Sequence, residues 1–167
     1  GATEYRLFVA RDSLFTSPVA GYNPLALVGT SRVVSGLTAA TRYFYKVRAY
    51  NGNLSAYSDS TGLTTLPNAP AVPVAKAGSN ASHNGFRANW DSSAGATEYR
   101  LDVATNAGFT NFVAGYNNKQ VVGLTDTVSA TAALAANTTY YYRVRAANVG
   151  GTSASSGTIT QLTAPAV

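Results

Sequence analysis

Hydrophobic and polar residues alternate along short stretches of this chain. In residues 140–146 every second side chain is Tyr, Val or Ala, and the residues between them are Tyr141, Arg143 and Arg145. Residues 98–103 alternate in the same way. Successive side chains of a β-strand point to opposite faces, so a period of two predicts half-buried strands rather than helices.

Turn-forming sequences interrupt these stretches at regular intervals. They are Asn51-Gly52, Asn84-Gly85 and the segments 92–95 (SSAG) and 149–151 (VGG). Short alternating stretches separated by such turns are typical of antiparallel sandwiches. The pattern therefore predicts an all-β chain built from short strands.

The chain also repeats itself at a distance of 94 residues. The heptapeptide of residues 1–7 (GATEYRL) recurs unchanged as residues 95–101. After a slip of three residues, the stretch 43–49 matches 140–146. Solenoid units are shorter, at roughly 20 to 50 residues, so a repeat of this length predicts a string of small domains.

The two copies of the repeat are not equally complete. Residues 68–94 precede the second heptapeptide and have no counterpart in the first copy, and residues 164–167 (APAV) repeat residues 69–72. We therefore predict a partial domain at 1–66, a complete domain at 67–163, and the start of a following linker or repeat at 164–167. This organisation indicates a window on a longer tandem array.

A proline-rich segment joins the two copies. Prolines at every third position, Pro67, Pro70 and Pro73, match the period of a polyproline II helix. Such a segment predicts a short, stiff spacer between neighbouring domains.

Composition and charge exclude several classes of protein. Charged residues make up 11% of the chain, the formal net charge is +5, and no basic block stands out. Binding to nucleic acid requires concentrated positive charge, so nucleic acid is not an expected partner. Cysteine is absent, which removes disulfides and thiolate metal sites, and no apolar run is long enough to span a bilayer. We expect a secreted protein that is extracellular or attached to the cell surface.

No group of residues predicts catalysis. The single histidine, His83, lies in the polar segment 79–85, which predicts a solvated loop. Glu4 and Glu98 are the acidic residues that repeat, and each lies two residues before an arginine, so an ion pair on a solvated face explains them. A glycosidase needs two carboxylates across a cleft, which a small sandwich does not offer. We predict a protein that is not an enzyme and holds no metal or cofactor.

One segment of each copy resembles the fibronectin type III domain. Leu134 is followed six residues later by Tyr140, and Leu37 by Tyr43. The second copy is also similar to this family in its proline-rich first strand and in a second strand that ends in Trp90. The resemblance implies immunoglobulin-like antiparallel β-sandwiches in tandem. It further implies that Tyr43 and Tyr140 form the tyrosine corner, in which the hydroxyl bonds to backbone just upstream.

The resemblance covers the first copy only from its third strand onward, so the first sandwich lacks its two N-terminal strands. We expect its inward side chains to face water on one side and to require a cover. These side chains are Tyr5, Leu7, Val9, Tyr43, Tyr45 and Val47. The covering strands come either from upstream residues of the same chain or from another subunit by strand addition.

An outer sheet face is the best candidate for binding. The third and sixth strands are neighbours in this family, which places arginines beside aromatic rings that can stack on sugars or hold acidic polymers. A simpler interpretation is that the arginine stems cover the rings and solubilise the sheet. The candidate face consists of Arg6, Phe8, Phe44 and Arg48 in the first copy, and Arg100, Tyr141, Arg143 and Arg145 in the second.

Three functions are consistent with these patterns. The first is a non-catalytic structural or spacer repeat of a long bacterial surface, adhesin-like or fibre-forming protein, whose partners are neighbouring repeats or adjacent subunits. The second is an accessory module of a secreted polysaccharide-degrading or proteolytic enzyme. The third is a module that binds polysaccharide or a cell-surface protein through the Arg and aromatic face. The near-identical copies favour the first.

Overall fold

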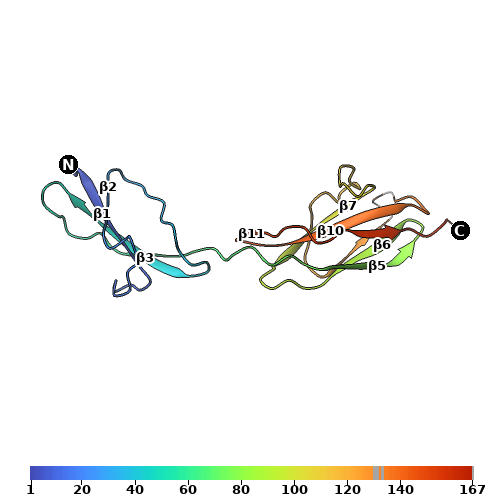
Figure 1. The fold of residues 1–167 in the computed structure, drawn as a ribbon, viewed down its shortest axis with the longest axis horizontal. Coiled ribbons are helices and arrows are strands. Elements are labelled where there is room, and N and C mark those ends of the chain that lie inside the picture. The colour runs from blue at the N-terminus through green and yellow to red at the C-terminus, as the bar shows by residue number, and fades with distance from the viewer. Residues whose placement is uncertain (130–131, 133, 167) are drawn as a thin grey trace. The chain divides into compact units, whose positions relative to one another are not determined.

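A computed structural model describes residues 1–129, 132 and 134–166 of the chain. These residues form two compact units, Gly1–Pro67 and Asn68–Val167, which we call unit 1 and unit 2 (Figure 1). The strands of both units pair only in the antiparallel sense across the described residues. The predicted all-β class is therefore confirmed.

Unit 2 is a sandwich of two sheets. In the first sheet the strand order is β11-β10-β7-β8, with β12 also paired to β10, and in the second it is β5-β6-β9. The strands of the first sheet are β7 (Glu98–Ala104), β8 (Lys119–Val121), β10 (Thr139–Asn148), β11 (Gly151–Thr152) and β12 (Ile159–Leu162). Those of the second sheet are β5 (Ala75–Ser82), β6 (Gly85–Trp90) and β9 (Thr125–Val128).

The core of unit 2 lies between these two sheets. Phe86 and Trp90 of β6 are 2% and 3% exposed, and they belong to the same buried cluster as Leu101 and Val144 of the opposite sheet. The rings of Phe86 and Tyr142 stack with centroids 5.9 Å apart. The alternation seen in the sequence thus places one face of each sheet against the other, as a sandwich requires.

Unit 1 contains one sheet, with strand order β2-β1-β3-β4. Its strands are β1 (Glu4–Ala10), β2 (Leu25–Leu27), β3 (Arg42–Tyr50) and β4 (Thr61–Thr64). Within the described residues, unit 1 has no counterpart of β5 or β6. Residues 31–34 are the repeat equivalents of β9. They form no strand, because β9 pairs with β6 and the described residues of unit 1 contain no counterpart of β6.

The expected exposure of the inward side chains in unit 1 is wrong for half of them. Leu7, Val9 and Tyr43 are only 6%, 3% and 2% exposed, because residues from the segment between β1 and β3 pack over them. Tyr45 remains 38% exposed, whereas its repeat equivalent Tyr142 is completely buried. A single sheet with one covering segment therefore closes only part of the apolar face.

A tyrosine hydroxyl accepts a backbone hydrogen bond at the same place in each unit. The N–H of Ala135 donates to Tyr140 over 2.8 Å, and the N–H of Thr38 donates to Tyr43 over 2.9 Å. Hydrogen bonds from Thr38 lower the pKa of Tyr43. Each bond fixes the backbone that leads into β3 in unit 1 and into β10 in unit 2.

Ala164 is bonded within unit 2. The N–H of Ala164 donates to the carbonyl of Ser82, and the carbonyl of Ala164 accepts from the N–H of Asn137, over 2.9 and 3.0 Å.

We predict that Tyr140→Phe lowers the free energy of unfolding of unit 2 by about 1 to 3 kcal/mol, because the N–H of Ala135 loses its partner in a part-buried site. Chemical denaturation of the whole chain, followed by the fluorescence of Trp90, measures this loss. Tyr141→Phe, on the outer face of the same strand, serves as the control and is expected to change stability little. Equal midpoints for Tyr140→Phe and the parent would contradict the role of this hydroxyl.

Candidate functional site

The outer face of the unit 1 sheet brings cations and aromatic rings together. The register of β1 and β3 places Arg6 opposite Arg48 and Phe8 opposite Lys46. Phe44 lies further along β3, opposite Ala10, and its ring is 5.1 Å from the guanidinium carbon of Arg42. Of the predicted face, Arg6, Phe8 and Arg48 are therefore close neighbours and Phe44 is at one end.

Five residues of this face form what we call the aromatic-cation cluster: Phe8, Phe15, Lys46, Arg48 and Tyr57. The Nζ of Lys46 lies 4.1 Å from the ring centre of Phe15 and 4.2 Å from that of Tyr57. The Cζ of Arg48 lies 4.7 Å from the Tyr57 ring, and Tyr57 meets Phe8 edge to face at 5.2 Å. Phe8 is only 8% exposed beneath these groups, whereas Tyr57 is 45% exposed.

Sequence reasoning missed Phe15 and Tyr57. Both lie outside the strands, so no alternating pattern assigns them to a face. The only available signal was the recurrence of Phe15-Thr16 as Phe109-Thr110. That recurrence has a structural counterpart, because Phe109 lies beside Arg143 in unit 2, with 4.1 Å between the guanidinium carbon and the ring centre.

The corresponding face of unit 2 is organised around a buried carboxylate. Asp102 occupies the repeat position of Phe8 and is 1% exposed. Its Oδ2 lies 2.9 Å from Nε of Arg143 and 3.2 Å from Nη2 of Arg145, and its Oδ1 accepts the N–H of Asn118 over 2.7 Å. These contacts satisfy the charge of Asp102 and engage two of the four residues predicted as a face in this unit.

The other two members of that face are also placed by the sheet. Arg100 lies opposite Arg145 in the register of β7 and β10, but its guanidinium pairs with Glu98. Tyr141 lies opposite Ala104, at the far end of the same pairing, and is partly exposed. The arginines of this face, Arg100, Arg143 and Arg145, are therefore matched by carboxylates of their own sheet.

A lysine on the neighbouring strand β8 is also paired, with a carboxylate on β9 of the second sheet. The ammonium of Lys119 bonds to Asp126 over 2.6 Å and to the hydroxyl of Tyr116 over 3.2 Å. Partial burial lowers the pKa of Lys119, but the hydrogen bonds to Asp126 and Tyr116 outweigh this effect, so the pKa is raised overall. Lys119 stays charged and paired over the whole physiological range.

The two outer faces differ in electrostatics as a result. Among the described residues of unit 1, the only ion pair joins Arg6 to Glu4. Lys46 and Arg48 contact rings instead of carboxylates, and the Nε of Arg48 is buried without a hydrogen-bond partner. The aromatic-cation cluster thus carries two positive charges that the sheet does not neutralise.

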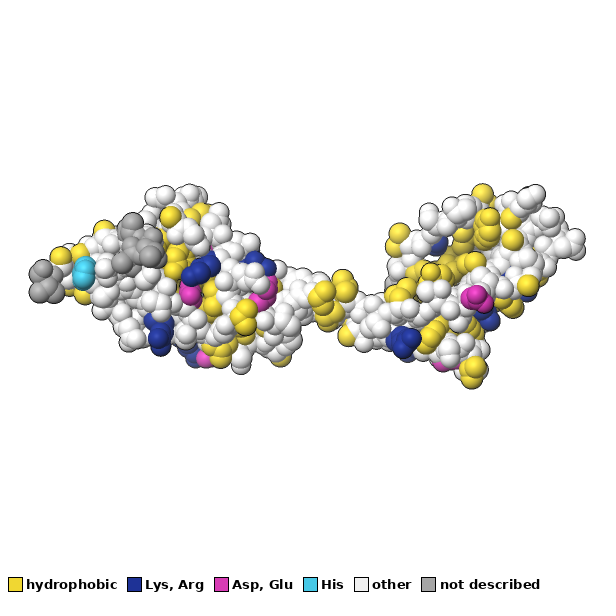
Figure 2. Space-filling model, turned by 180° about the vertical axis from the view of Figure 1, so that it is seen from behind, with side chains coloured by type: hydrophobic (Ala, Val, Ile, Leu, Met, Phe, Trp, Pro, Cys, Tyr) yellow, Lys and Arg dark blue, Asp and Glu magenta, His cyan; other side chains and the backbone are white. Residues whose placement is uncertain are grey.

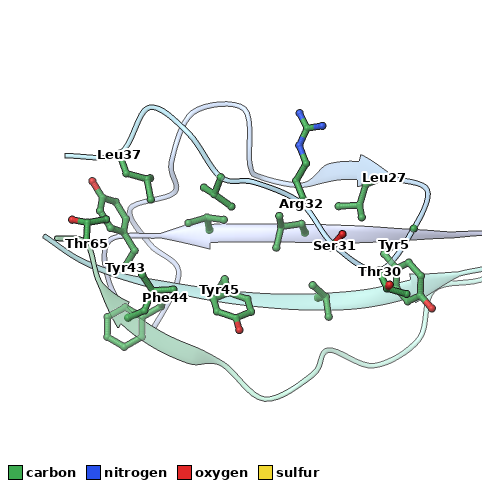
Figure 3. A pocket seen from close by; sticks show the side chains of 16 residues that line it. Tyr5, Leu27, Thr30, Ser31, Arg32, Leu37, Tyr43, Phe44, Tyr45 and Thr65 are labelled. Atoms are coloured by element: carbon green, nitrogen blue, oxygen red, sulfur yellow. The ribbon is translucent and has the colours of Figure 1, made fainter. Parts of the chain in front are cut away.

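The opposite face of the unit 1 sheet is hollow. A cavity of about 700 Å³ lies between the sheet and the segment of residues 28–37. In Figure 3, Leu27 and Leu37 lie on one side of it and Tyr45 projects from β3 on the other. Figure 2 shows hydrophobic side chains inside this hollow, in the unit that carries no histidine.

The described residues hold no assembled metal site. His83 is exposed in the turn between β5 and β6, and no group of three or more His, Cys, Asp or Glu residues is placed to hold a metal ion in this part of the chain. The described residues also contain no helix of the length and apolarity that a membrane span requires. Two surfaces of unit 1 have functional potential: the aromatic-cation cluster and the hollow face.

Comparison with known proteins gives two sequence relatives. The chain is 28% identical to chitinase A1 of Niallia circulans over 162 residues. This match covers 87% of this chain and 22% of that protein. The chain is also 31% identical to exoglucanase B of Cellulomonas fimi over 156 residues. This match covers 85% of this chain and 13% of that protein. The chain thus spans less than a quarter of the length of these curated relatives. No family model matches the chain.

Comparison of structures identifies the architecture. The crystal structure of the chicken CNTN1 FN1-FN3 domains superimposes with a TM-score of 0.61 at 18% sequence identity. The match covers 98% of this chain and 57% of that chain. At this identity the likeness establishes a shared fold.

We predict that Asp102→Ala lowers the free energy of unfolding of unit 2 by about 2 to 4 kcal/mol, because Arg143 and Arg145 lose their buried counter-charge. Thermal or urea denaturation measures the change. Asp91→Ala is the matched control, since its pair with Lys76 is half exposed at both ends and should contribute less than about 1 kcal/mol. Similar losses for the two variants would contradict the special role of Asp102.

Proposed function

We propose that this chain, which has the fold of tandem fibronectin type III domains, is a non-catalytic accessory region of an extracellular polysaccharide-degrading enzyme. The observation that carries the proposal is the similarity to a chitinase and to an exoglucanase. In both comparisons the matching region is a small part of a much longer protein. This arrangement favours the accessory role over the fibre-forming repeat that the two near-identical copies suggest.

The physical character of the chain supports a spacer within such an enzyme. Charged residues are 11% of the sequence, so the surface offers little for strong electrostatic partners. Between β4 and β5, residues 65–74 form no strand and contain the three regularly spaced prolines. The carbonyl of Leu66 accepts a hydrogen bond within unit 1, those of Asn68, Ala71 and Val74 accept within unit 2, and Pro70 and Pro73 are buried. An extracellular location is part of the same proposal.

Identification of what adjoins these residues in the natural protein tests this function. Antibodies raised against unit 2 would capture the polypeptide from the culture medium of its source organism, and mass spectrometry of its peptides would identify what adjoins these residues. We expect a catalytic domain of a polysaccharide-degrading enzyme in the same polypeptide. Many further copies of the repeat with no catalytic domain would instead support a surface or fibre-forming protein and would reject the proposal.

A second candidate function is the binding of an acidic polysaccharide by the aromatic-cation cluster. The observation that favours it is the presence of Phe8 where unit 2 has Asp102, because this difference leaves Lys46 and Arg48 without a carboxylate on the sheet. Ammonium and guanidinium groups beside a half-exposed ring can hold both the charge and the face of an acidic sugar. In unit 2 the same face is neutralised internally, so unit 1 would carry the binding.

Titration of the whole chain with polygalacturonate tests the second candidate. The double variant Lys46→Ala and Arg48→Ala should weaken binding by about tenfold or more, the equivalent of roughly 1.4 kcal/mol. The matched control removes two exposed cations of unit 2, Lys76 and Arg87, and should weaken binding much less. Equal losses in both variants would show that only net charge matters and would reject a site at the cluster.

A further inference from the structure

We propose that Phe15 is a ligand-contacting ring of the aromatic-cation cluster and that Asp12 is the residue that positions it. Both residues lie in the loop between β1 and β2, outside the regular strands. The proposal rests on the second candidate function, the binding of an acidic polysaccharide, and extends that site from the sheet to this loop. Three features carry it: the hydrogen bonds of Asp12, the backbone of Phe15 and the contrast with unit 2.

The carboxylate of Asp12 organises the loop. Its Oδ1 accepts the N–H groups of Leu14 and Thr16 over 3.0 and 3.1 Å, and its Oδ2 accepts the N–H of Ser17 over 2.7 Å. Hydrogen bonds from the backbone, that of Thr16 first, lower the pKa of Asp12, so the group stays ionised at neutral pH. One side chain therefore holds three backbone groups around Phe15 in place.

The backbone of Phe15 takes a conformation that aromatic residues avoid. Its φ is 60°, in the left-handed region, where a bulky side chain is strained. Such strain persists only where the surrounding structure fixes the chain, and it is often found at binding sites. The ring centre of Phe15 consequently lies 4.1 Å from the Nζ of Lys46. Tyr57 contacts the same ammonium group at 4.2 Å, so two rings from outside the strands share one cation.

Unit 2 repeats the loop with an asparagine. Asn106 stands at the repeat position of Asp12. Its Oδ1 accepts the N–H groups of Thr110 and Asn111 over 3.2 and 3.1 Å, and the intervening Phe109 has a φ of 53°. An acceptor oxygen at this position is therefore sufficient to hold the loop, with or without a negative charge.

The two loops differ in how accessible their rings are. In unit 2, Phe109 is only 7% exposed, and its ring centre lies 6.4 Å from that of Phe112. Unit 1 has Pro18 at the position of Phe112, and Phe15 is partly exposed. The ammonium group beside Phe15 also has no carboxylate partner within the described residues. Phe109 is thus part of a packed surface, whereas Phe15 is available to a ligand.

A ring beside an ammonium group that no carboxylate neutralises suits an acidic sugar. The C–H face of the sugar packs on the aromatic ring, while its carboxylate pairs with the cation. Phe15 therefore adds a second stacking surface to the one that Tyr57 offers beside Lys46.

Titration of the whole chain with polygalacturonate compares three variants. Phe15→Ala removes the ring, and Asp12→Ala removes the acceptors that position it, so each should weaken binding roughly fivefold or more. Asp12→Asn is the matched control, because it removes the same charge as Asp12→Ala but keeps an acceptor, as Asn106 does in unit 2. This control should bind within about twofold of the parent.

NMR measures the position of the ring without ligand. The methylene protons next to the Nζ of Lys46 should resonate upfield of those of an exposed lysine, because the rings of Phe15 and Tyr57 shield them. This shift should fall in Phe15→Ala and to the same extent in Asp12→Ala, and it should stay unchanged in Asp12→Asn. Amide hydrogen exchange of β1 and β3 reports in each variant whether the sheet is intact.

The outcomes separate this proposal from the function on which it rests. A parent chain that does not bind polygalacturonate would reject the second candidate function and with it the ligand contact of Phe15. If the parent binds and Phe15→Ala binds equally well, the ligand contact of Phe15 alone is rejected. An unchanged Lys46 shift in Asp12→Ala, or equal losses of binding in Asp12→Ala and Asp12→Asn, would overturn the positioning role. Loss of protection throughout β1 and β3 in Asp12→Ala would overturn it too, since Asp12 would then stabilise the whole sheet.

Discussion

The face-to-face packing of two apolar sheet faces is the interaction on which unit 2 depends, and unit 1 shows the same sheet without it. In unit 2, Phe86 and Trp90 lie against Leu101 and Val144, and all of them are almost or completely inaccessible to water. Burial of a large apolar side chain contributes roughly 1.5 to 3 kcal/mol. A few such residues therefore account for a large part of the stability of a domain this small.

Other features of the units follow from this packing. Strand β9 forms because β6 is present beside it, and the hydroxyl of Tyr142 is satisfied because the β5–β6 hairpin lies over it. Unit 1 keeps the sheet and its backbone-bonded tyrosine but lacks the hairpin. Its segment 31–34 is consequently without strand structure, and Tyr45 is exposed. The two units thus show the same repeated sequence with a second β-sheet in unit 2 and without one in unit 1.

The fold was largely predictable from the sequence, because alternation and repetition are local signals. The all-β class and the sandwich follow from the alternation and the turns, and the incomplete first copy follows from residues such as Trp90, which the second copy has and the first lacks. The burial of Leu7 and Val9 was not predictable, since it depends on how the segment after β1 folds back over the sheet. Such tertiary packing leaves no periodic trace.

The surfaces were harder to predict than the fold. Alternation assigned Asp102 to the solvated face of its strand, yet the residue is 1% exposed because two arginines lie over it. Phe15 and Tyr57 lie in connecting segments, where no pattern assigns a side chain to a face. The difference between Phe8 and Asp102 is visible in the sequence, but its consequence depends on the positions of Lys46, Arg48, Arg143 and Arg145.

Native-state hydrogen exchange of the unmodified chain tests the central claim most directly, because it compares the two sheets within one molecule. If a closed core is what stabilises these units, the amides of β7 and β10 should exchange only through global unfolding of unit 2. The equivalent amides of β1 and β3 should exchange at least about 100-fold faster, through opening of the half-covered sheet. Equal protection of the two sheets in a monomeric chain would contradict the account.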